Sequence, residues 1–160
     1  MVRKVFFSFD FDRDAWRAGQ IRNSGVTRDN AGFLDVVDWE AVKKKGSDEI
    51  KKWINNQITG TSVTVVLIGA KTNESYYVQY ELEQSWKKGN GILGIYIHQV
   101  KNADSRTDVK GSNSFGGIFP SSYDNKKYFA DRFPTYDWVD NDGRNNIDKW
   151  IEIAAKSAGK

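Results

Sequence analysis

The fold is decided by one stretch, Thr61-Ser-Val-Thr-Val-Val-Leu-Ile68, which is apolar and rich in β-branched residues. Apolar side chains fall on both faces of this segment. Strands of that kind belong in the middle of a parallel sheet, where helices cover both sides. We therefore expect a central buried strand here, and the rest of the fold is built outward from it.

Shorter strand-like and helix-like segments alternate on both sides of this strand. Strands are predicted over 4–9, 32–37, 91–97 and 136–139, and helices over about 14–22, 47–57, 75–88 and 146–158. Ser47 and Ser75 are typical helix N-caps. Strands that alternate with helices through right-handed crossovers predict a doubly wound α/β fold of the flavodoxin-like kind. It has a five-stranded parallel sheet in the order 2-1-3-4-5 and helices on both faces.

The chain of 160 residues is the size of one domain, with one unusual stretch at about 98–134. That stretch is rich in Asn, Ser, Gly and Lys and lacks periodicity. Unstructured connections of this length are uncommon in compact domains, so a functional lid and a disordered insertion both remain open. No segment approaches the ~20 apolar residues of a membrane span, and Met1-Val-Arg-Lys4 leads directly into a strand. We expect a soluble, cytoplasmic protein without membrane contact.

The composition excludes several kinds of catalytic and binding site. The chain has no cysteine and one histidine, which excludes thiol nucleophiles and multi-histidine metal sites, and no metal or resident cofactor is expected. The sequence has no Gly-x-Ser-x-Gly motif that could supply a serine nucleophile to His98, so a hydrolase triad is not expected. The net charge of +3 is scattered and does not form the basic stripe of a nucleic-acid binder. Aromatic residues are 14% of the chain, more than the core needs, so some are expected to line a ligand surface.

Three common small-sheet functions do not fit. Gly89-Asn-Gly-Ile-Leu-Gly94 matches the dinucleotide fingerprint GxGxxG, but these glycines end a helix and open a strand, which is the wrong context. A phosphoacceptor receiver needs an aspartate after the third strand, where the chain has Leu67-Ile-Gly69. A flavin-phosphate loop needs a Ser/Thr/Gly-rich turn after the first strand, where Asp10, Asp12 and Asp14 would repel phosphate.

The order 2-1-3-4-5 places a ligand crevice at the carboxyl ends of the first and third strands. Ser8, Phe9 and Asp10 end the first strand, and Gly69, Ala70 and the helix opening at Ser75 follow the third. The second strand is expected to supply Asp38 and Trp39 from the side.

Glu81 is the chemically informative residue of the helix that opens at Ser75. It shares a stripe at helical spacing with Val78 and Leu82, one turn beyond Tyr77. A carboxylate on an apolar face is costly unless it is paired or lies at a crevice. It is either an ordinary glutamate on the flank of the stripe or a carboxylate between aromatic rings, able to stabilise an oxocarbenium ion in glycosidic cleavage.

Several blocks together resemble the Toll/interleukin-1 receptor (TIR) domains, and among them the TIR-like ThsB proteins of bacterial Thoeris antiphage defence. Val5-Phe-Phe-Ser-Phe9 is similar to the first TIR strand. Ser75-Tyr-Tyr-Val-Gln-Tyr-Glu81 is similar to the TIR motif Ser-x-Trp-Cys-x-x-Glu, with Tyr77 in the place of Trp. The blocks 61–69, 88–95 and 136–143 also resemble ThsB, so the resemblance covers nearly the whole chain.

The resemblance implies an enzyme of the NAD+ nucleosidase or ADP-ribosyl cyclase type. Such an enzyme uses NAD+ as substrate, releases nicotinamide and makes a cyclic or modified ADP-ribose messenger for a downstream effector protein. It implies Glu81 as the catalytic residue. The substrate-binding candidates around it are Phe7, Ser8, Phe9, Asp10, Asp38, Trp39, Tyr77 and Tyr80. A homo-oligomeric active form is compatible with this reading. The alternative is a TIR-like adaptor that binds a partner without turnover, and half-buried core packing is the alternative for the aromatic residues.

Overall fold

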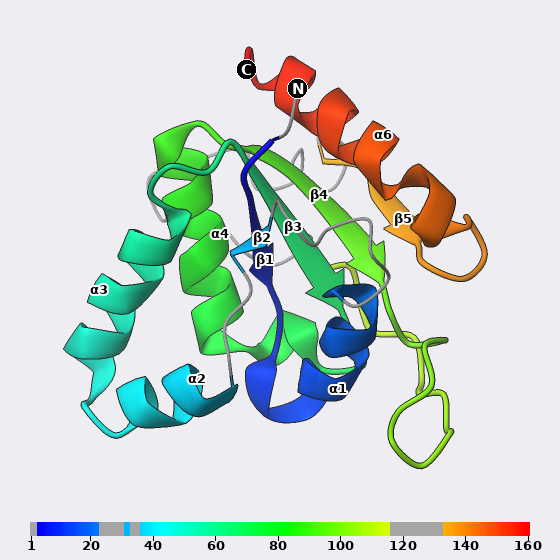
Figure 1. Ribbon diagram of the computed structural model, residues 1–160, viewed down its shortest axis with the longest axis horizontal. Coiled ribbons are helices and arrows are strands. Elements are labelled where there is room, and N and C mark those ends of the chain that lie inside the picture. Colours follow the sequence, from blue (N-terminus) through cyan, green and yellow to red (C-terminus); the bar gives the residue numbers. More distant parts are fainter. Residues whose placement is uncertain (1–2, 23–30, 33–35, 116–132) are drawn as a thin grey trace.

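The computed structural model describes residues 3–22, 31–32, 36–115 and 133–160, and within them the order of the parallel sheet is β2-β1-β3-β4-β5, as predicted (Figure 1). The strands are β1 (Val5–Ser8), β2 (Ala31–Gly32), β3 (Val63–Ile68), β4 (Gly91–Tyr96) and β5 (Thr135–Asp137). The helices are α1 (Phe11–Arg22), α2 (Val36–Lys43), α3 (Ser47–Ile58), α4 (Tyr76–Lys88) and α6 (Gly143–Ser157), and a short 3-10 helix, η1 (Thr72–Glu74), precedes α4.

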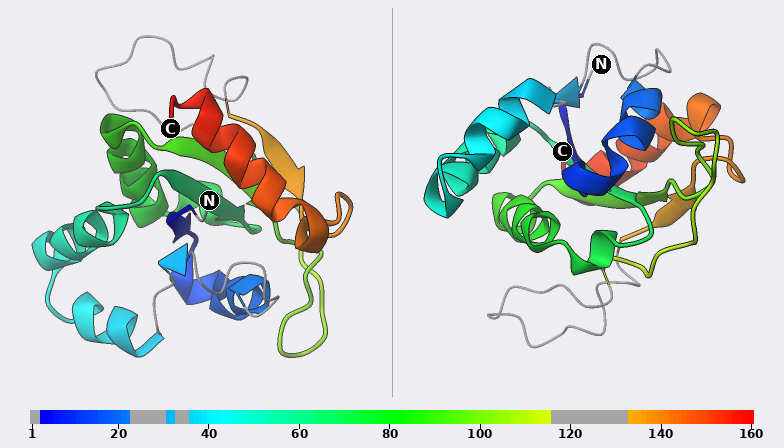
Figure 2. Two further views of the ribbon diagram at one scale, coloured as in Figure 1. Left: turned by 45° about the horizontal axis from the view of Figure 1, so that its top comes forward. Right: turned by 90° about the horizontal axis from the view of Figure 1, so that it is seen from below.

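The central strand β3 is buried along its whole length, which confirms its predicted place. Its side chains alternate between two layers. Val63, Val65 and Leu67 pack into a cluster with α1 and α6, whereas Val66 and Ile68 pack against α4. Figure 2 shows α1 and α6 on one side of the sheet and α4 on the other. Because both faces are covered, an apolar run on both faces of β3 is stable.

Helix α4 begins and ends at the predicted signals. The Ser75 hydroxyl accepts a hydrogen bond from the backbone N–H of Val78, as an N-cap does. Gly89 ends the helix in the left-handed region at φ 84°, where glycine is favoured. Gly91 then opens β4. The GxGxxG match is therefore a helix end followed by a strand, as the sequence context indicated.

The predicted strand over 32–37 is wrong at its end, because helix α2 has already begun at Val36. Gly32 lies in strand β2 (Ala31–Gly32), and residues 33–35 lie outside the described part of the chain. Short apolar runs fit a strand or a buried helix equally well, and packing decides between them. Here Val42 of α2 packs against the cluster that Phe6 and α3 form.

The first part of the 98–134 stretch has defined contacts to α1. The buried Arg17 side chain donates from Nε to the Val100 carbonyl at 2.7 Å and from a terminal nitrogen to the Arg106 carbonyl at 3.0 Å. It also lies 3.7 Å from the Asp108 carboxylate. Residues 116–132 lie outside the described part, so a lid function of the stretch stays a prediction. No helix in the described ranges has the length and hydropathy needed to cross a lipid bilayer.

A substitution at Gly91 tests how closely β4 and α6 pack. A Cβ built there would lie 2.3 Å from the backbone oxygen of Ala154 in α6, so Gly91→Ala must push the helix away from the sheet. We expect a loss of about 1–3 kcal/mol in the free energy of unfolding, measured with urea. Gly19→Ala in α1 is the control, because nothing lies within 4 Å of its added Cβ. That variant should gain about 0.5–1 kcal/mol. Equal stability of the two variants would contradict this packing.

Candidate active site

The candidate site lies at the carboxyl edge of the sheet, where the strand order reverses. The chain leaves β1 toward β2 on one side, and β3 lies on the other side of β1. In register, Ser8 at the end of β1 is beside Val66 of β3. Helix α4 begins near this edge after η1 and contacts β1, β3 and β4. Ligand crevices of doubly wound sheets form at such a switch point.

Glu81 is a buried carboxyl at this switch point. It lies in the second turn of α4 and is 7% exposed, which is inconsistent with an ordinary glutamate in solvent. The buried Ser8 hydroxyl donates a hydrogen bond to Oε2 of Glu81. Burial raises the pKa of Glu81 to about 8, although the Ser8 hydrogen bond opposes the shift. The carboxyl is therefore mostly protonated at neutral pH in this structure.

A small hollow of about 50 Å³ opens beside Glu81. Its walls are aromatic and acidic. The lining residues are Phe7, Phe9, Asp10, Phe11, Asp12, Ser75, Tyr77 and Glu81. The rings of Phe9 and Phe11 stack with their centroids 5.2 Å apart, and Tyr76 meets Tyr77 edge to face at 5.3 Å. Among the described lining residues, Asp10, Asp12 and Glu81 are acidic and none is Lys or Arg, so the hollow favours a cationic ligand.

The sequence candidates fall into four groups. Five of them line the hollow together, namely Phe7, Phe9, Asp10, Tyr77 and Glu81. Ser8 does not line it but contacts Glu81 directly. Tyr80 lies on the α3 side, where its hydroxyl accepts a hydrogen bond from Asn55 at 2.9 Å and its ring lies 5.3 Å from the Lys51 ammonium. Asp38 and Trp39 are in α2, and their side chains lie outside the described part of the chain.

Phe11 and Asp12 also line the hollow and were not among the sequence candidates, whereas the helix opening at Ser75 was expected at this crevice. The cause is the start of α1, which begins at Phe11 and not at about 14. The Asp10 carbonyl accepts hydrogen bonds from the N–H groups of Arg13 and Asp14, so Asp10 stands at the helix N-terminus. Asp followed by another acid in the next turn is a helix-start signal that could have placed Phe11 in the first turn.

The loop between β3 and α4 is held by a second buried carboxyl, that of Asp14. Thr72 accepts a hydrogen bond from the Gly69 N–H at 2.8 Å, and its hydroxyl lies 3.5 Å from Asp14. Burial, and next the charge of Asp10, raise the pKa of Asp14 to about 6 against the opposing charge of Arg17. These contacts fix the chain between β3 and the Ser75 cap, and so they position α4.

A second hollow, of about 330 Å³, adjoins the first. It is lined by Asp10, Arg13, Lys71, Glu74 and Ser75, so the two hollows share Asp10 and Ser75. Its lining includes the cations Arg13 and Lys71, whereas the described lining of the first hollow includes no Lys or Arg.

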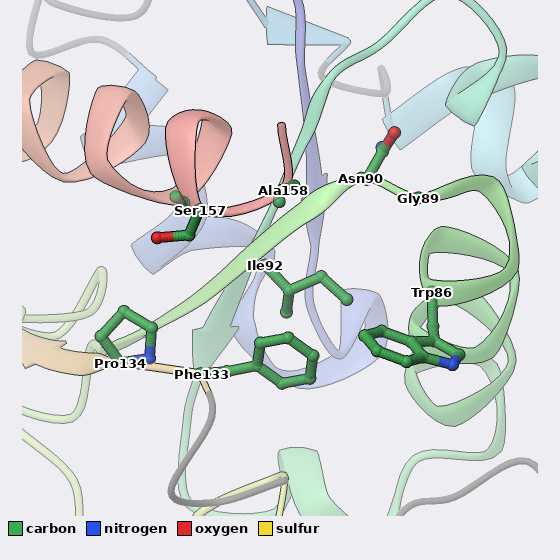
Figure 3. A pocket seen from close by; sticks show the side chains of 10 residues that line it. Trp86, Gly89, Asn90, Ile92, Phe133, Pro134, Ser157 and Ala158 are labelled. Carbon is green, nitrogen blue, oxygen red and sulfur yellow. The ribbon is translucent and has the colours of Figure 1, made fainter. Parts of the chain in front are cut away.

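A third hollow, of about 300 Å³, lies elsewhere, at the amino end of β4. Figure 3 shows Trp86, Ile92 and Phe133 gathered on one side of it, with Pro134 and Ser157 nearby. The Trp86 and Phe133 rings meet edge to face at 5.8 Å. None of its described lining residues can carry a charge. It is larger than the hollow at Glu81, but its described lining offers no group for acid–base or electrostatic catalysis.

Glu81 should make stability depend on pH. Its pKa is 4.5 when unperturbed and about 8 in the folded protein, so between these values the unfolded chain has released a proton that the folded protein keeps. The free energy of unfolding therefore falls as pH rises across this window. Glu81→Gln lacks this titration. Its stability relative to wild type should increase from about pH 5 to about pH 8 by a few kcal/mol in urea unfolding.

Glu83→Gln is the matched control for this titration. Glu83 is on the same helix and pairs with Lys87 at 3.1 Å near the surface. Its stability difference from wild type should stay nearly constant over the same pH range. A difference that is also constant for Glu81→Gln would contradict the raised pKa.

Two comparisons with known proteins point to the same family. Residues 6–102 match the sequence model of the family described as "Thoeris protein ThsB, TIR-like domain". A protein of Bacillus cereus strain MSX-D12, named "Putative cyclic ADP-D-ribose synthase ThsB1", is 33% identical over 191 aligned residues. The alignment covers 94% of this chain and 100% of that protein. The fold, the buried glutamate of α4 and these two matches lead to one conclusion: the chain belongs to the ThsB family of TIR-like proteins of the Thoeris system.

Proposed function

We propose that this protein cleaves the nicotinamide–ribose bond of NAD+ and converts the remaining ADP-ribose into a cyclic or otherwise modified signalling nucleotide. The observation that carries the proposal is the buried Glu81 carboxyl, hydrogen-bonded by Ser8 beside an aromatic hollow at the sheet switch point. The name of the Bacillus cereus relative, which describes a cyclic ADP-D-ribose synthase, supports the same chemistry. On this proposal the nucleotide product acts on a downstream effector protein.

The reaction needs few protein groups. The bond between ribose C1′ and the nicotinamide nitrogen breaks, and its electron pair leaves with neutral nicotinamide. Positive charge then develops on the ribose as an oxocarbenium ion. Ionised Glu81 accepts a hydrogen bond from a ribose hydroxyl and stabilises this charge. A nucleophilic atom of the same ADP-ribose attacks C1′ and closes the ring, and a proton that this atom carries is released to solvent.

The charges around the hollow suit the nicotinamide end of NAD+. Among its described lining residues, Asp10 and Asp12 carry carboxylates, and Glu81 carries a carboxyl that is mostly neutral without substrate. The nicotinamide ring of NAD+ carries a positive charge, so it is attracted where a phosphate would be repelled. The rings of Phe9 and Phe11, which stack on each other, give the hollow an apolar wall for a flat ring. We place the nicotinamide and its ribose in this hollow.

Substrate entry requires side chains to move. The hollow of about 50 Å³ is well below the ~300–1,000 Å³ of ordinary ligand pockets. Tyr77 and Phe11 line it and are only partly buried, so they are the side chains that can swing outward. Closure of these rings over the bound ribose would exclude water, which otherwise competes with the internal nucleophile.

The protonation of Glu81 links binding to chemistry. Without substrate, burial keeps the carboxyl mostly neutral, because its pKa is about 8. A cationic nicotinamide ring beside it favours the ionised form and lowers that pKa. The catalytic carboxylate therefore forms as the substrate binds.

Glu81→Gln should abolish nicotinamide release, with a loss of about 100-fold or more, because an amide cannot stabilise the cation as a carboxylate does. Purified protein is incubated with NAD+, alone and with extract from infected cells, and nicotinamide and ADP-ribose isomers are separated by chromatography. Glu83→Gln is the control on the same helix and should react like wild type. If folded Glu81→Gln and wild type give the same product profiles in both conditions, the enzymatic function is wrong and the adaptor function is favoured.

The rate should also report the titration of Glu81. Because kcat/KM follows the protonation of the free enzyme, it should rise with pH and level off above about pH 8. Ser8→Ala removes the hydrogen bond that lowers this pKa, so the midpoint should move to higher pH. The test is a pH profile of nicotinamide release for both proteins. An unchanged midpoint in Ser8→Ala would show that the profile does not report Glu81.

A further inference from the structure

The hollow next to the Glu81 site differs from it in charge. Its lining includes two cations, Arg13 from the first turn of α1 and Lys71 from the loop that follows β3. The carboxylates of Asp10 and Glu74 complete the charged lining. At about 330 Å³ it reaches the size range of ordinary ligand pockets, which the Glu81 hollow does not.

Both cations can be recruited by an anionic ligand. Lys71 pairs with Glu74 at 3.7 Å, but the two side chains are 52% and 64% exposed, and such surface pairs contribute little. A phosphate can replace that partner at small cost. Arg13 is exposed, and its charge lowers the pKa of Asp10 and Asp14 against the effect of their burial. Its guanidinium has enough donors to bind phosphate as well.

The start of α4 adds a third positive feature. Ser75 lines this hollow and is the N-cap of a helix of 13 residues. The first backbone N–H groups of a helix lack partners within it, and its dipole makes this end positive. Anions bind at such ends. Two side chains and one helix end, from three parts of the chain, thus surround the same space.

The order of the two hollows matches the order of groups in a dinucleotide. The hollows share Asp10 and Ser75, so a ligand can pass from one to the other without leaving the protein surface. In NAD+ the nicotinamide ribose is joined through its 5′ carbon directly to the pyrophosphate. A phosphate site must therefore adjoin the ribose site, and the Glu81 hollow does not suit it, because its described lining has acidic side chains and no Lys or Arg.

We propose that Arg13 and Lys71 bind the pyrophosphate of the dinucleotide in the hollow that adjoins Glu81. This inference rests on the proposed function, because it places the substrate relative to Glu81. Arg13 and Lys71 are substrate-binding residues on this reading and take no part in bond breaking. Asp10, at the junction of the hollows, then lies beside the ribose that links the two ends.

The test compares two substrates with the same scissile bond. NAD+ carries the pyrophosphate, and nicotinamide riboside carries no phosphate. The double variant Arg13→Gln/Lys71→Gln should lose about tenfold or more in kcat/KM for NAD+, chiefly through KM, because charge-assisted hydrogen bonds are lost. Its kcat/KM for nicotinamide riboside should stay within about twofold of wild type. An equal loss for both substrates, or no loss for NAD+, overturns the proposal.

A matched pair of cations controls for net charge. Lys52 pairs with Glu49 at 3.8 Å with the same i,i+3 spacing as Lys71 and Glu74, but on α3. Arg144 is exposed in the first turn of α6, as Arg13 is in α1. Lys52→Gln/Arg144→Gln removes the same charge away from the hollow and should leave both substrates unaffected. A loss for NAD+ in this control as large as in the test variant would mean that only overall charge matters, which overturns the site.

A binding measurement separates this proposal from the proposed function. Calorimetry with ADP-ribose, which has the pyrophosphate but no scissile bond, needs no turnover. Wild type should bind ADP-ribose with an affinity that falls as salt rises. The Arg13→Gln/Lys71→Gln variant should bind it at least about tenfold more weakly. Equal binding by both proteins, or no binding by wild type, overturns the phosphate site, whereas absent turnover with this binding difference intact would count against the proposed reaction alone.

Discussion

The buried hydrogen bond between Ser8 and Glu81 is the interaction on which the rest of the site depends. It joins the last residue of β1 to the second turn of α4, across 73 positions of sequence. A buried carboxyl without a partner is costly, so Glu81 is tolerated here only because β1 ends with a hydroxyl at that point. The register of β1 on β3 and the Ser75 cap both have to be correct for the two groups to meet. The site therefore forms only when both the sheet and the helix cap have formed correctly.

The features that could be predicted from the sequence are those with strong local signals. The run 61–68 predicted the central strand because burial on both faces leaves an apolar pattern that few other structures share. Ser75 and Gly89 predicted the ends of α4 because capping depends on the chemistry of single residues. The spacing of Val78, Glu81 and Leu82 predicted a stripe that faces the sheet and left open whether Glu81 lies within it or on its flank; all three residues are buried.

What could not be predicted depends on contacts between distant parts of the chain. The segment 32–37 reads as a strand, yet Val36 begins a helix, because the packing of α2 on α3 decides between two patterns that look alike. Periodicity cannot tell a carboxylate at the flank of a stripe from a buried one, since that depends on Ser8 from another element. The two cations of the adjoining hollow are also far apart in sequence. No short motif could have brought Arg13 and Lys71 together.

The different charges of the two hollows distinguish the two possible orientations of a bound dinucleotide. On the proposed function, the acidic hollow holds the cationic end of NAD+, and the hollow with Arg13 and Lys71 holds its anionic middle. A dinucleotide bound in the reverse sense would put phosphate beside the carboxylates of Asp10 and Asp12, where repulsion disfavours it. Since Glu81 is mostly neutral until a cation lies beside it, only the productive orientation also generates the carboxylate. On the proposed function, the burial that keeps Glu81 neutral without substrate therefore also selects the orientation in which the glycosidic bond lies next to the group that stabilises its cleavage.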